Sequence, residues 1–126
     1  MRSGLALGAS ALAGLAAVIA SLDGDADIVP FFVGLTLLGG VGAWATGEPI
    51  SPGRRRIARG TAVVWLGAAG WIGVLLLMYQ ATCGCSMPAP IGPEATYLGL
   101  PATVYHLAGV YLGGALMAVA AFSRRL

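Results

Sequence analysis

The stretch GTAVVWLGAAGWIGVLLLMYQATCGCSMPAPIGP, which runs from Gly60 to Pro93, contains no Asp, Glu, Lys or Arg. An arginine cluster directly precedes it and consists of Arg54, Arg55, Arg56 and Arg59. A helix of about 20 apolar residues is long enough to cross the hydrocarbon core of a bilayer, and basic residues beside such a span stay on the cytoplasmic side. The stretch is therefore typical of a membrane-spanning helix that begins at the cytoplasmic face.

The composition of the whole chain agrees with a membrane protein. Of the 126 residues, 58% are hydrophobic and 10% are charged, whereas about 25% of the residues in a soluble domain are charged. So few charges could not cover the surface of a water-soluble fold of this length. The basic residues are all arginines beside predicted spans, so the net charge of +2 does not indicate nucleic-acid binding.

Three further uncharged segments resemble the first in length. The sequence predicts helices over about 3–22, 28–47, 52–82 and 100–122, with an outer loop over 83–99. Helices are expected because a backbone in lipid must satisfy its own hydrogen bonds, and the alternating pattern of barrel strands is absent. We expect a single transmembrane domain over 1–126, an all-α four-helix transmembrane bundle with up-down-up-down order. A cleaved signal peptide is the alternative interpretation of the first segment, but we expect that segment to be retained.

The charged residues predict how the chain crosses the membrane. With four crossings, all the arginines lie on one side. The acidic residues other than Glu48 lie on the opposite side, and these are Asp23, Asp25, Asp27 and Glu94. Because arginines mark the cytoplasmic side, we expect a multi-pass protein of the cell membrane with both termini in the cytoplasm. The arginine cluster would then lie at the lipid headgroups, where arginine attracts anionic lipid.

Helix ends and interfaces carry local signals. Asp27 is placed to cap the second helix, and Pro30 is tolerated in its first turn. Ser51 and Pro52 suit the cap and first position of the third helix, while Pro101 can open the fourth. Four aromatic residues lie near predicted membrane interfaces, where amphipathic rings are favoured; these are Trp44, Trp65, Tyr79 and Tyr97.

Glycines are expected to let the helices pack closely. Membrane helices associate through small residues that allow their backbones to approach. Two pairs have the GxxxG spacing: Gly4 with Gly8 in the first helix, and Gly109 with Gly113 in the fourth. We expect these four residues to lie at helix contacts.

The predicted spans contain almost no ionisable residue. Carboxylates and basic groups are absent from the hydrocarbon region apart from the arginines at its ends. Because functional proton and ion pathways depend on such groups, this pattern argues against a small four-helix proton-coupled antiporter or an ion pump. His106 is the one titratable side chain at membrane depth, and we interpret it as a packing residue that hydrogen bonds to Gln80.

The predicted outer loop contains the two cysteines of the chain, Cys83 and Cys85. Three interpretations suit this C-x-C pair. A disulfide could stiffen the turn, or the same strained ring could exchange electrons, because strain makes a disulfide easier to reduce. Alternatively, the reduced thiolates could bind Cu(I), which soft sulfur ligands select. In that case Met87 is the expected added ligand, His106 is a more distant one, and copper is the cofactor.

The sequence contains no complete catalytic motif and favours a scaffold over an enzyme. We expect a non-catalytic accessory or assembly subunit of a larger membrane complex, binding through the outer loop because loops carry function more often than the scaffold. Its partners would be the lipid bilayer and other membrane protein subunits, and not nucleic acid. The alternative is an extracytoplasmic thiol-redox or Cu(I)-handling membrane protein centred on the C-x-C pair.

Overall fold

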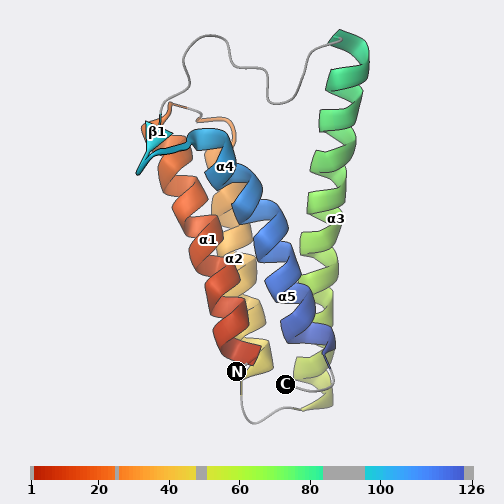
Figure 1. Cartoon of the computed structure of the whole chain (residues 1–126). Helices are drawn as coiled ribbons and strands as arrows, with labels where there is room; N and C mark the ends of the chain where they lie inside the picture. The colour runs from red at the N-terminus through yellow and green to blue at the C-terminus, as the bar shows by residue number, and fades with distance from the viewer. Residues whose placement is uncertain (1, 25, 48–50, 84–95, 124–126) are drawn as a thin grey trace.

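A computed structural model of the chain describes residues 2–24, 26–47, 51–83 and 96–123. Three long helices come first, followed by a short hairpin and a final helix (Figure 1). The elements are α1 (Arg2–Leu22), α2 (Val29–Thr46), α3 (Pro52–Cys83), β1 (Thr96–Tyr97), β2 (Leu100–Pro101), α4 (Ala102–Leu107), the π-helical segment η1 (Ala108–Leu112) and α5 (Gly113–Phe122).

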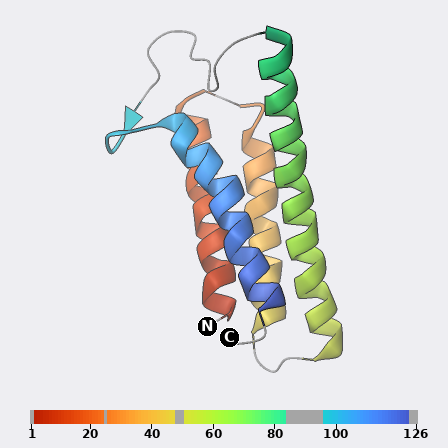
Figure 2. The same cartoon turned by 45° about the vertical axis from the view of Figure 1, so that its right-hand side comes forward.

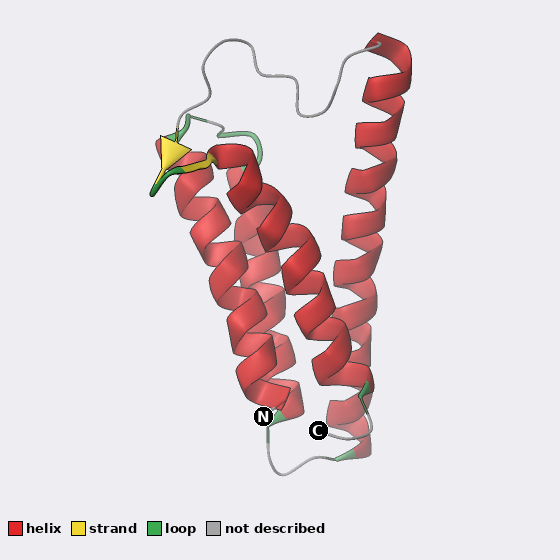
Figure 3. Cartoon of the chain, viewed as in Figure 1, coloured by secondary structure: helices red, strands yellow, loops and turns green. Residues whose placement is uncertain are grey.

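The last three helical elements follow one another without a break and form one long helix (Figure 3). With α1, α2 and α3 it gives four helices that are long and apolar enough to cross a membrane. The prediction of a mainly helical chain with four candidate spans is therefore confirmed. These spans indicate a multi-pass membrane protein.

The fourth predicted helix begins later than expected, because a small hairpin precedes it. Strands β1 and β2 are antiparallel, with Thr96 opposite Pro101 and Tyr97 opposite Leu100. The two residues between them, Leu98 and Gly99, both have positive φ angles of 54° and 80°. A two-residue hairpin turn with positive φ at both positions matches the twist of the strands. The predicted outer loop over 83–99 thus overlaps the end of α3 and this hairpin.

Consecutive long helices run in opposite directions (Figure 1). Around the bundle, α1 packs on α2, α2 on α3, α3 on α5, and α5 on α1 (Figures 1 and 2). The arginine end of the bundle contains Arg2 at the start of α1 and the first turns of α3. The opposite, aspartate end contains Asp23 and Asp27, which lie between α1 and α2.

The predicted starts of two helices have different outcomes. Ser51 caps α3, since its Oγ accepts a hydrogen bond from the backbone N–H of Arg54 at 3.2 Å. Asp27 does not cap α2 as predicted. The helix begins one residue later, so Ile28 takes the capping position and no side chain caps the first turn. Pro30 lies in that first turn, as expected.

Helices α1 and α2 are the most closely packed pair of the bundle. A Cβ added at Gly39 of α2 would lie 2.8 Å from the Cβ of Ser10 on α1, so the two backbones are in close contact. Two hydroxyls also cross this interface: Ser10 Oγ donates to the Thr36 carbonyl at 2.7 Å, and Ser3 Oγ donates to the Ala43 carbonyl at 3.1 Å. In membrane proteins such interhelical hydrogen bonds contribute on average about 0.6 kcal/mol each.

Trp65 joins α3 to the last helix. Its side chain is fully buried, and its Nε1–H donates to the carbonyl oxygen of Val110 at 2.9 Å. Val110 lies inside η1, where π-helical geometry disturbs the usual hydrogen-bond ladder, so a side chain can reach a backbone carbonyl. Tyr111 adds a second link from η1, because its hydroxyl donates to the Ala69 carbonyl at 3.0 Å.

Helix α3 is the least enclosed of the four. Of its 18 most apolar consecutive residues, 22% are buried, against 33% to 39% in the other spans. It contacts α2 and α5 and, to a small extent, η1. Figure 1 shows its C-terminal half standing away from α4. The arginine end of α3 is therefore packed into the bundle, while one long face remains open.

Candidate functional site

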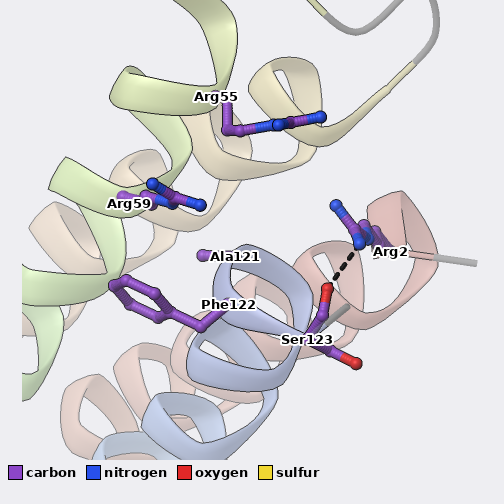
Figure 4. Close-up of a pocket in the computed structure, with 6 residues that line it drawn as sticks. All are labelled: Arg2, Arg55, Arg59, Ala121, Phe122 and Ser123. Atoms are coloured by element: carbon purple, nitrogen blue, oxygen red, sulfur yellow. Dashed lines mark hydrogen bonds between the residues drawn. The ribbon is translucent and has the colours of Figure 1, made fainter. Parts of the chain in front are cut away.

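The arginine end contains a cavity of about 310 Å³ that three arginines share. Arg2 comes from the first turn of α1, and Arg55 and Arg59 come from successive turns on one face of α3 (Figure 4). Residues four positions apart lie on the same side of a helix, which explains why both α3 arginines reach the same space. The rest of the lining comes from Ala121, Phe122 and Ser123 at the end of α5.

Neutral groups hold two of these arginines in place. The guanidinium of Arg2 donates through one of its terminal nitrogens to the carbonyl oxygen of Ser123 (Figure 4). The guanidinium carbon of Arg59 lies 6.0 Å from the centre of the Phe122 ring, within the range of a cation–π contact. A carbonyl and an aromatic ring orient a guanidinium without neutralising its charge, so the cavity remains positive.

The other two members of the arginine cluster have different surroundings. Arg54 faces α2: its guanidinium donates to the Trp44 carbonyl and lies 4.5 Å from the centre of the Trp44 ring. Arg56 does not line the three-arginine cavity. It lines a second space of about 250 Å³ with Arg55 and Arg59, together with Ser51 and Pro52. The placement of the arginine cluster at the lipid headgroups stays a prediction. Within the fold, Arg55 and Arg59 line both spaces, whereas Arg54 packs on Trp44.

No described carboxylate lies near the arginine cavity. Asp23 and Asp27 are at the aspartate end, and the 21 residues of α1 separate the two ends by about 30 Å at 1.5 Å per residue. That distance exceeds the Debye length of about 8 Å at physiological ionic strength. The described acidic side chains therefore do not offset the positive potential of the cavity.

His106 lines a second kind of space, an apolar cavity of about 200 Å³ near the aspartate end. Its ring stacks on Phe32, with ring centres 5.5 Å apart and an angle of 30° between the planes. Ile72 and Leu76 of α3 and Thr103 of α4 also line this space. His106 of α4 thus packs against α2, while the predicted partner Gln80 has no described side chain.

The predicted cysteine site falls largely outside the described residues. Cys83 is the last residue of α3, but its side chain is not described, and Cys85 and Met87 lie in the undescribed segment 84–95. Among the described residues, no group of three or more His, Cys, Asp or Glu side chains could hold a metal ion. The disulfide, the redox role and the Cu(I) site with His106 remain predictions.

The four predicted packing glycines have contrasting surroundings. A Cβ added at Gly109 would lie 2.9 Å from the Ala16 Cβ on α1, and one at Gly113 would lie 2.6 Å from Cζ2 of Trp65 on α3. At Gly8 the nearest atom would be Cδ1 of Leu116, at an ordinary 3.6 Å. At Gly4 no neighbouring atom lies within 4 Å. The second GxxxG pair therefore touches two helices, whereas Gly4 faces open space.

The sequence did not reveal that Arg2 and the end of α5 share a cavity with the arginine cluster. The signal for it was the placement of Arg2, the cluster and Ser123 at span ends on the same predicted side. Charge sidedness gives depth in the membrane, but it does not say which helix ends are neighbours.

Comparisons of the chain with protein-family models, with curated proteins and with solved structures found no match in any of the three. The functional interpretation therefore depends on the described geometry and the chemistry of the side chains.

Proposed function

We propose that this chain is a multi-pass protein of the cell membrane, with both termini in the cytoplasm, and that it serves as a non-catalytic accessory or assembly subunit of a larger membrane complex. The arginine end would face the cytoplasm and the aspartate end the outside, because basic residues flanking a span remain inside. The observation that carries the assembly role is the open face of α3.

That open face contains three exposed glycines. Gly60, Gly67 and Gly70 each have no neighbouring atom within 4 Å of an added Cβ. Gly60 and Gly67 are seven positions apart, and Gly67 and Gly70 are three positions apart, so all lie on one side of the helix. The apolar residues around them are also exposed, and Trp71 is 63% exposed. Covering a helix with lipid requires no glycines, whereas close approach of a second helix does.

The proposed subunit would therefore bind its partner through the exposed face of α3, while the other helices pack mainly on one another. Gly39 of α2 and Gly113 of α5 pack within the bundle, whereas the outward glycines include Gly60, Gly67 and Gly70 of α3, Gly4 of α1, and Gly34 and Gly40 of α2. Helix α3 differs from the other helices because it is the least buried of the four spans. The outer loop, through which the sequence predicts binding, falls partly in the undescribed segment and stays a second proposed contact. Both contacts would lie on α3 or directly after it.

Site-specific photo-crosslinking in the source membrane tests the assembly role. A photoreactive residue at Gly67 should form adducts with another membrane protein, because this position faces outward on α3. The matched control is Leu7, which is exposed on α1 and should react with lipid. Equal protein crosslinking from both positions, or none from either, would contradict a partner on α3.

A further inference from the structure

We propose that the cavity formed by Arg2, Arg55 and Arg59 binds the phosphate of an anionic membrane lipid that carries more than one negative charge. The site combines the first turn of α1, two turns of α3 and the end of α5. This inference depends on the proposed membrane insertion, which would place the arginine end among the headgroups of the cytoplasmic leaflet.

The chemistry of the lining matches a phosphate group. A guanidinium presents its N–H groups as a planar fork that fits two oxygens of a phosphate. Three such groups around one cavity supply more positive charge than a single phosphodiester can neutralise. A phosphomonoester, or a headgroup with two phosphates, matches that charge better.

The geometry keeps these groups available for a ligand. Arg2 is anchored through Ser123 and Arg59 by Phe122, so binding would require less ordering of these long side chains. The cavity volume of about 310 Å³ is on the order of ten times the 30 Å³ that one water occupies in the liquid. It can therefore hold a phosphate with several bridging waters.

The lining is mainly polar, but the position of the cavity beside the last apolar turn of the final span favours lipid over a soluble phosphate compound. Ala121 and Phe122 border the cavity within the last turn of the final span, next to the guanidinium groups. A basic pocket between transmembrane helices on the cytoplasmic side is a common form of phospholipid headgroup site. A soluble phosphate would leave the apolar part of this lining unused.

The test uses the full chain reconstituted in nanodiscs. Wild-type protein in phosphatidylcholine nanodiscs is titrated with cardiolipin or phosphatidic acid, and bound lipid is counted by native mass spectrometry. R59Q and R55Q should each weaken binding at least about tenfold, the equivalent of losing one charge-assisted hydrogen bond. R56Q is the matched control, because it removes the same charge from the same helix outside the cavity, and it should change binding by about twofold or less.

Three further results decide the interpretation. Equal losses in R56Q and R59Q would show diffuse attraction and overturn the site. R55Q guards against misfolding of R59Q, because Arg55 is exposed and can be replaced without removing the Phe122 contact. If inorganic diphosphate displaces the lipid from wild-type protein with equal affinity, the cavity is a soluble-phosphate site and the lipid assignment is wrong.

The experiment also separates this inference from the proposed function. Protein that enters neutral nanodiscs but shows no preference for phosphate-rich lipid would overturn the lipid site alone. Loss of crosslinking at Gly67 would instead contradict the assembly role, whatever the lipid titration shows. Failure of the wild-type chain to enter any nanodisc would contradict membrane insertion, on which both depend.

Discussion

At the scale of single residues, the environment predicted for Trp65 from the sequence differs from the one in the structure. Its position near a predicted interface suggested an aromatic anchor between water and lipid, but it is fully buried between α3 and the last helix. The indole N–H finds its partner inside the protein, at the Val110 carbonyl. Sequence position reports depth along the membrane normal, whereas the face of the helix decides between lipid and core.

Replacing Trp65 with Phe should destabilise the bundle. The change removes the N–H donor, leaves a buried carbonyl without that bond, and opens a small cavity. The expected loss of unfolding free energy is about 1–3 kcal/mol. Unfolding by SDS in mixed micelles measures it, with Trp71→Phe as the control because Trp71 faces outward. Equal losses in the two variants would contradict a special role for the buried indole.

Gly113 and Gly67 should respond in opposite ways to the same substitution. Gly113→Ala places a Cβ against the rigid ring of Trp65 and should cost about 1–3 kcal/mol of stability through overpacking. Gly67→Ala meets open space and should be neutral or slightly stabilising, because Ala favours helix over Gly by about 1 kcal/mol. Thermal melting in detergent compares them. A destabilising Gly67→Ala would mean that the bundle is packed differently around α3.

Cys83 and Cys85 should be disulfide-bonded to each other in the isolated protein. The prediction depends on their expected placement in an oxidising compartment, and on Gly84, whose backbone freedom suits a ring this small. After alkylation without reductant, mass spectrometry should find both cysteines unalkylated. Two alkylated thiols with stoichiometric copper in protein kept from air would support the metal site instead, and a link between two chains would indicate a covalent dimer.

At the scale of elements, the ends of the first three helices were predicted to within one residue. The first-turn Pro30 of α2 and the Ser51 cap of α3 mark two of the starts through local chemistry, whereas Asp27 does not cap α2. The prediction of the fourth span was less accurate, because the hairpin Thr96–Pro101 directly precedes it and the π-helical segment η1 lies within it. A π-helical turn depends on the side chains packed against it, such as Trp65, which bonds to Val110. The sequence of the turn itself does not predict it.

The open half of α3 should be the most dynamic long helix in detergent. Beyond Ile72 it has few packing partners within the described bundle, whereas α1 has buried alanines along its length, at Ala6, Ala9, Ala13, Ala16 and Ala20. Local opening requires less free energy where fewer contacts must break. Hydrogen exchange should therefore be faster over 72–78 than over 6–20. Exchange as slow in α3 as in α1 would indicate a partner on α3, such as a second copy.

At the scale of the whole molecule, the described charges divide between the two ends of the bundle. Arg2 and the arginine cluster are at one end, and Asp23 and Asp27 are at the other. The sequence anticipated this division because it depends only on the number of crossings. It could not anticipate the arginine cavity, because a cavity depends on which helices become neighbours.

Cysteine accessibility in intact cells tests the proposed orientation. In a background with Cys83 and Cys85 replaced by Ser, single cysteines at Ser3 and Ser51 should be shielded from a membrane-impermeant thiol reagent. A cysteine at Ala26 should be labelled. Permeabilised cells provide the control, since all three positions should then react. Labelling at position 51 from outside the cell would invert the topology.

The hydrogen bond from Trp65 to Val110 also sets an order of events during synthesis. The donor precedes its acceptor by 45 residues, which at 5–20 residues per second is a delay of roughly 2–9 s. Over that interval α1 and α2 can already pair, because their contacts are complete within the first 46 residues of the chain. With the proposed membrane insertion, α3 would wait in the bilayer with the indole N–H of Trp65 unsatisfied until the last helix is made. A chaperone or insertase that shelters polar groups in nascent helices would have its period of greatest demand there.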